Sequence, residues 1–74
     1  MERAPNLLDV VELLRDVPAE GLHRGQQGTV VDLLESSGAG LLVEFANGDG
    51  EMIALATLAP NDVRTIWRLK VPTG

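Results

Sequence analysis

The residues best placed by type and spacing to do chemistry are the glycines of the segment from Gly21 to Gly28. A phosphate cradle needs backbone N–H groups that converge on an anion, usually in front of a helix N-terminus. Here a β-branched run follows Gly28 in place of a helix, and no Lys-Ser or Lys-Thr pair closes the motif. We therefore predict that Gly25 and Gly28 allow a turn and a bulge at the entrance to a strand.

Three other patterns resemble catalytic or metal-binding motifs but lack essential members. His23 is the sole histidine, and no nucleophile or carboxylate has a spacing that points to it. Alternate polar residues in 47–51 resemble the start of a calcium loop, but Met52 and Leu58 stand where that loop needs glycine and glutamate. The serines at 36–37 are not in the G-x-S-x-G order of a nucleophile elbow. The sequence thus predicts no catalytic, cofactor-binding or metal-binding residue, and a protein that is not an enzyme.

Cationic side chains gather near the C-terminal end, at Arg64, Arg68 and Lys70. A nucleic-acid surface would need more basic residues, with exposed aromatic side chains between them. The formal net charge of −5 also repels a phosphate backbone. We interpret these charges as protection of an edge strand against unwanted pairing, and the sequence argues against a nucleic-acid partner.

The length of 74 residues and the lack of cysteine restrict the possible architectures. A chain this short forms one domain, 1–74 with an ordered core of about 7–69, and oligomerisation would add stability to so small a core. Neither a disulfide framework nor a thiolate metal site can form. No apolar run approaches the roughly 20 residues of a membrane span and no targeting segment is evident, so we expect a cytoplasmic protein without a membrane partner.

Runs of aliphatic and β-branched residues, separated by turn residues, predict five short strands. We place them within 7–15, 29–34, 41–45, 51–58 and 63–69. The first is ambiguous, because Leu7, Val10, Val11 and Leu14 also fit one face of a helix, but a strand suits its neighbours better. A tight turn or a single turn of 3-10 helix at 59–62 is expected before the last strand.

Two connections shape the predicted sheet. The long one, from 16 to 24, is bent by proline and glycine, and Leu22 is the apolar residue that could pin it to the core. The strongest turn signal is 47–50, because Asn-Gly and Asp-Gly tolerate positive φ and so favour a hairpin at Gly48 and Gly50. Five short strands with a long first loop and a turn before the last strand are typical of a small SH3-like barrel.

An ordered series of motifs carries a family resemblance, which covers roughly Leu8 to Ile66. Its members are 9–16, Pro18, Gly21-Leu22, Gly25, 28–31, 43–45, Leu55 and 57–58. They resemble a small bacterial family, the domain of unknown function numbered 4926. That resemblance implies an SH3-like barrel and no established activity. Over the pair 25–31 and 43–45 alone, the chain is also similar to KOW-type motifs and to the barrels of nitrile hydratase β subunits.

Apolar positions exceed what a five-stranded barrel can enclose, above all because 52–58 is apolar on both faces. Ile53 and Leu55 lie on one side of that strand, and a one-residue bulge would exchange which set faces the core. We assign one alternate set, together with neighbouring apolar residues, to an interface with a second copy or another protein. The predicted interface residues are Leu42, Met52, Ala54, Ala56 and Trp67.

The sequence therefore predicts a non-enzymatic protein-interaction or regulatory module that self-associates through an apolar strand face. Two alternatives stay open. The first is an acidic accessory protein, comparable to an antitoxin, that controls a neighbouring enzyme or toxin. The second is a KOW-like nucleic-acid-binding module in which Arg64 and Arg68 contact phosphates. None of these functions requires a cofactor.

Overall fold

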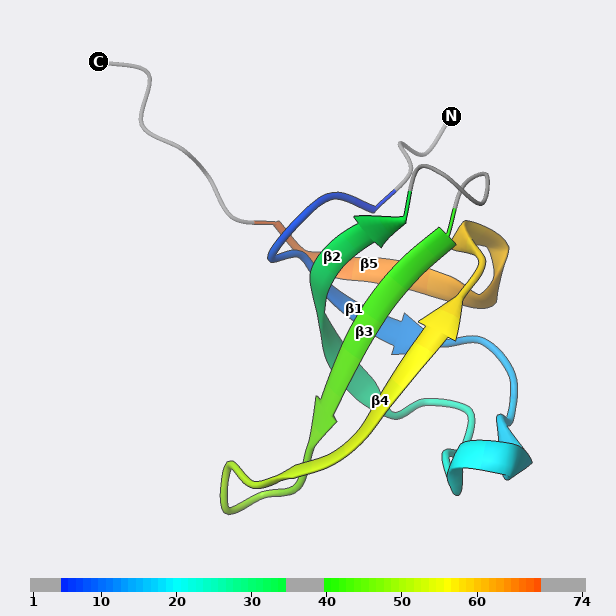
Figure 1. Ribbon diagram of the computed structural model, residues 1–74, viewed down its shortest axis with the longest axis vertical. Helices are drawn as coiled ribbons and strands as arrows, with labels where there is room; N and C mark the ends of the chain where they lie inside the picture. Colours follow the sequence, from blue (N-terminus) through cyan, green and yellow to red (C-terminus); the bar gives the residue numbers. More distant parts are fainter. Residues whose placement is uncertain (1–4, 35–39, 69–74) are drawn as a thin grey trace.

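The computed structural model describes residues 5–34 and 40–68, which form an all-β domain (Figure 1). The predicted fold class is confirmed, because the described residues contain five strands and no α-helix. The strands and the short 3-10 turns between them are β1 (Val10–Leu13), η1 (Pro18–Glu20), β2 (Gln27–Leu34), β3 (Gly40–Ala46), β4 (Met52–Leu58), η3 (Pro60–Asp62) and β5 (Val63–Trp67). None of the described helices is long and apolar enough to cross a membrane. Residues 35–39, between the second and third predicted strands, and the end of the last predicted strand lie outside the described residues.

The strands form one antiparallel sheet in the order β4-β3-β2-β1-β5. The sheet is strongly twisted, and the chain passes from β4 to β5 through η3, where a turn of 3-10 helix was expected (Figure 1). Strands β4 and β5 occupy the two edges and do not pair with each other. The sheet is therefore open, without the closure that a complete barrel would have.

One face of this sheet carries the hydrophobic core. In β3, alternate residues turn toward this core, since Leu41, Val43 and Phe45 are all buried. Every strand contributes at least one buried apolar residue because each turns one face inward. The core consists of Val11, Leu13, Leu22, Val30, Leu41, Val43, Phe45, Ala56, Leu58 and Val63.

The long connection between β1 and β2 is fastened to the core by Leu22, as the sequence predicts. The Leu22 side chain is 1% exposed, and its backbone forms an isolated bridge with Val17. Gly21, at φ 69°, ends η1 in the left-handed region that glycine adopts without steric cost. Asp16 closes the loop from the other side, because its Oδ1 accepts the N–H of Arg24 at 2.8 Å.

The hairpin at 47–50 forms as predicted, although only one of its two glycines needs a special conformation. Gly50 has φ 83°, whereas Gly48 is not in the positive-φ region. The Asn47 side chain closes the turn, since its Oδ1 accepts the N–H groups of Asp49 at 2.9 Å and Glu51 at 3.0 Å. The turn is therefore closed by the side chain of Asn47, whereas the sequence prediction relied on the Asn-Gly and Asp-Gly pairs.

Gly28 has a role different from the one predicted. Gly25 is in a turn at φ 93°, as expected, but Gly28 lies inside β2 directly opposite Phe45. A Cβ atom on Gly28 would lie 2.7 Å from Cγ1 of Val43 and 2.9 Å from Cδ2 of Phe45. The register shift of β2 falls further along, between Val30 and Asp32. Gly28 is therefore needed for close packing, and no bulge forms there.

Candidate functional site

Strand β4, at one edge of the sheet (Figure 1), carries more large exposed apolar side chains than any other described strand. Met52 is 59% exposed, Ile53 50% and Leu55 44%. We call these three residues the β4 edge surface. A contiguous group of exposed apolar side chains on a small domain is typical of a docking surface.

The structure turns two of the predicted interface residues of β4 toward the core. Ala56 is 4% exposed and belongs to the core, and Ala54 packs partly buried against the same core. Ala56 therefore offers almost no surface to a partner, and Ala54 offers only part of its side chain. Of the predicted set on this strand, Met52 alone is exposed.

A register shift explains the exchange. Phe45 of β3 faces Ala54 and the next residue, Ala46, faces Met52, so Ile53 has no partner in β3. This extra residue breaks the alternation at the start of β4. As a result Met52 is exposed, although Ala54, Ala56 and Leu58, which follow it at every second position, face inward.

The remaining two predicted interface residues are separated from each other. Leu42 lies half-buried on the outer face of β3, opposite Thr57 of β4, and so borders the β4 edge surface. Trp67 is 53% exposed but belongs to β5, at the opposite edge of the sheet. Three strands lie between β5 and β4 (Figure 1), so the sheet does not bring Trp67 and Met52 together.

Both arginines considered for phosphate contact are paired with carboxylates of the protein. Arg64 Nη2 donates to Oε1 of Glu12 at 2.9 Å across the β5–β1 pair. Arg68 Nη1 lies 3.7 Å from Oδ2 of Asp9, a buried carboxylate that also accepts the N–H of Asn6 at 2.8 Å. These pairings neutralise much of the positive charge that a nucleic acid would need.

The described residues hold no group of three histidine, aspartate or glutamate side chains able to bind a metal ion. His23 is exposed in the loop, and its backbone N–H donates to Oε1 of Gln26. Neither observation assigns chemistry to the imidazole. Among the described residues, the candidate site is the β4 edge surface.

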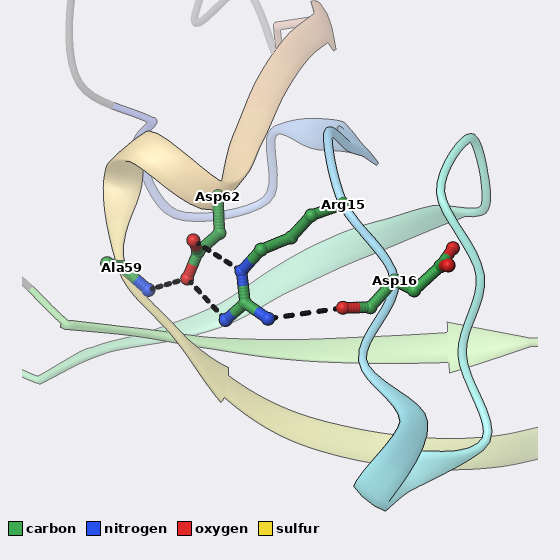
Figure 2. A network of polar contacts seen from close by, with 4 residues as sticks. All are labelled: Arg15, Asp16, Ala59 and Asp62. Atoms are coloured by element: carbon green, nitrogen blue, oxygen red, sulfur yellow. Dashed lines mark hydrogen bonds and ion pairs between the residues drawn. The ribbon is translucent and has the colours of Figure 1, made fainter.

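Arg15 and Asp62 form the most extensive side-chain network of the described structure (Figure 2). Arg15 donates to both carboxylate oxygens, with Nε 2.8 Å from Oδ1 and Nη2 3.2 Å from Oδ2 of Asp62. Its Nη1 donates to the carbonyl oxygen of Asp16 at 3.1 Å, and Oδ2 of Asp62 accepts the N–H of Ala59 at 3.0 Å. The network ties the first loop to η3.

The hydrogen bonds from Arg15 hold the pKa of Asp62 below its ordinary value, outweighing the partial burial that acts in the opposite direction. A carboxylate whose pKa is lower in the folded state than in the unfolded state stabilises the fold above the unfolded pKa, about 3.9 for aspartate. That stabilisation is lost as the pH falls through the folded pKa.

We therefore expect Arg15→Gln to lower the melting temperature at neutral pH and to have less effect as the pH falls below about 4. Thermal unfolding followed by circular dichroism across this range measures the difference from the unmodified protein. Arg24→Gln is the matched control, because the Arg24 side chain is exposed in the same loop and should give little difference at any pH. If the difference in melting temperature between Arg15→Gln and the unmodified protein stayed the same in acid, the Arg15–Asp62 pair would not be the source of that stability.

Ile53 and Leu55 are the exposed residues that the sequence did not place in the interface. The register shift opposite Ala46 exposes Met52 as well, and so obscured this side of β4 in the sequence. Polar residues at alternate positions would have revealed the outer face, but β4 has a single polar residue, Thr57. Thr57 is exposed, on the same side as Ile53 and Leu55, and is the one signal that pointed to the correct face.

Comparison with known proteins gives one match. The family model described as "Domain of unknown function (DUF4926)" matches residues 7–65. No curated protein and no solved structure matches the chain significantly.

Proposed function

We propose that this chain, which belongs to the DUF4926 family of domains of unknown function, is a non-enzymatic interaction module that self-associates. The β4 edge surface is the observation that carries the proposal, because its three exposed apolar side chains lie together on an edge strand. Association would remove these side chains from water at roughly 25 cal/mol per Å² of apolar area. Burial of this surface against a second copy of the chain would thus provide the driving force for self-association.

The titratable groups support an interaction module better than an enzyme. Catalytic acids and bases characteristically have pKa values displaced toward their task. In the described residues, the side chains with displaced pKa values are Arg15 and Asp62, and each is displaced by the other. That pair acts as a structural brace between a loop and η3.

Absolute mass by light scattering across a dilution series, at low and high salt, tests the proposal. We expect a mass near twice the 7.9 kDa of one chain at high concentration, persisting in high salt because apolar association is not screened. Met52→Lys should reduce the mass toward that of a single chain. Leu7→Lys is the control, since Leu7 is similarly exposed but lies before β1. A mass of 7.9 kDa at every concentration would refute self-association.

A second candidate is an acidic accessory protein that docks on a basic partner. Asp32 and Glu44 support it, because they are exposed on the neighbouring strands β2 and β3 of a chain with a formal net charge of −5. Opposite charge on a partner would accelerate association and make it sensitive to salt. A strictly monomeric chain in the experiment above would favour this second function over self-association.

A further inference from the structure

In the described structure, one backbone edge of strand β4 has no strand partner. The strand pairs with β3 on one side, and its backbone makes no hydrogen bond with any other element of the described structure. The nearby η1 satisfies its own backbone groups locally, with the N–H of Glu20 donating to Val17 and that of Gly21 to Pro18. An edge of this kind presents alternating N–H and C=O groups that can pair with another strand.

The two edges of the sheet differ in how they are protected. Strand β5 carries Arg64 within it and Arg68 immediately after it, and charged side chains at an edge oppose pairing with another chain. Strand β4 reads Met-Ile-Ala-Leu-Ala-Thr-Leu, without a charge, a proline or a glycine. Its register shift lies at the Ile53 end, so 54–58 remain regular. An uncharged edge with exposed apolar side chains is open to pairing.

Charge indicates what occupies this edge. Glu44 lies on the outer face of β3, beside β4, and Asp32 lies on the outer face of β2, so stacking of two outer faces would bring like charges together. Side-by-side pairing of two sheets avoids that contact, because β4 itself is neutral. A neutral, mostly apolar strand gives no basis for selecting a charged peptide, whereas another β4 matches it in both charge and hydrophobicity.

We propose that β4 pairs antiparallel with β4 of a second copy, joining two sheets across a two-fold axis that passes beside Leu55. This inference rests on the self-association proposed above and specifies its geometry. Leu55 is the central residue of Met52–Leu58, so the axis places it opposite its own counterpart. Ile53 then faces Thr57 of the second copy, and cross-strand side-chain pairs stabilise a sheet.

The proposed contact is short. Each copy contributes a strand of 7 residues, whereas a standard protein interface involves roughly 20–30 residues a side. The dimer should therefore be reversible, with a mass that falls on dilution at fixed salt.

Because the chain has no cysteine, one introduced cysteine reports on a single position. In the proposed register the two copies of Leu55→Cys lie directly opposite, with Cβ atoms about 4.5–5.5 Å apart, within reach of a disulfide or a short thiol crosslinker. The two copies of Met52→Cys lie at opposite ends of the pair, about 20 Å apart from the rise of a strand. Met52→Cys is the control variant. Because Met52 is more exposed than Leu55, random collisions between chains would crosslink Met52→Cys more than Leu55→Cys.

We expect mild oxidation of Leu55→Cys, at concentrations where the unmodified chain is dimeric, to give covalent dimer as the main product. Met52→Cys should give almost none, and circular dichroism verifies that both variants are folded. If the unmodified chain dimerises but Met52→Cys crosslinks as readily as Leu55→Cys, β4 pairing is overturned while self-association stands. If the unmodified chain stays monomeric at all concentrations, both proposals fail.

Discussion

Gly28→Ala should destabilise the fold by about 3 kcal/mol, at the upper end of the usual cost of overpacking a core. The added Cβ would lie 2.7 Å from Cγ1 of Val43, 2.9 Å from the carbonyl oxygen of Glu44 and 2.9 Å from Cδ2 of Phe45. Two of these atoms belong to fully buried side chains and one to the β3 backbone. The strands could accommodate the methyl group only by moving apart.

Urea unfolding measures this cost as a shift in the midpoint at constant slope. Gly48→Ala makes the same chemical change in the hairpin, where nothing lies within 4 Å of the new Cβ and φ is not positive. That control should be neutral or stabilise by up to about 1 kcal/mol, because alanine restricts the unfolded chain. Equal midpoints for Gly28→Ala and the unmodified protein would show that β2 and β3 tolerate a methyl group between them.

Leu22→Ala should cost about 2–4 kcal/mol, as for a leucine removed from a protein core. Leu22 lies in a connection rather than a strand, but it is among the largest fully buried side chains. Its loss would leave a cavity beneath the first loop and remove the apolar contact that supports the Val17–Leu22 bridge. Chemical unfolding gives the global effect, and amide exchange at Leu22 reports whether the loop opens first.

Leu14→Ala provides the comparison, because Leu14 is an exposed leucine at the start of the same connection. Its truncation should cost less than about 1 kcal/mol, as for most surface substitutions. If both variants lost the same stability, Leu22 would not be the anchor of the loop. If Leu22→Ala only made amide exchange in 16–24 faster and left the unfolding midpoint unchanged, Leu22 would order the loop without contributing to global stability.

The parts of the fold that could be predicted are those with an unambiguous local pattern. In strand β3 the charged Glu44 lies between Val43 and Phe45 and marks the outer face, so the buried face follows from a period of two. The hairpin at 47–50 follows from glycine and asparagine chemistry. Leu22 could be identified as an anchor because it is the one large apolar side chain between proline, glycine and charged neighbours.

The parts that could not be predicted depend on contacts between strands. Strand β4 is apolar on both faces, so the inward set was decided by a register shift opposite Phe45 and Ala46 that no local pattern encodes. The role of Gly28 is set by a phenylalanine on another strand. Trp67 could not be assigned to an edge of the sheet without the strand order.

The position of β1 between β2 and β5 has a consequence for synthesis on the ribosome. Strand β1 is made first, yet one of its two neighbours is the last strand, and the Glu12–Arg64 bond joins residues 52 positions apart. Such distant pairings make folding slow, because the chain must close a long loop before the contact forms. The nascent domain therefore cannot complete its sheet until β5 has emerged, and the apolar strands made before β5 are available to other chains during that interval.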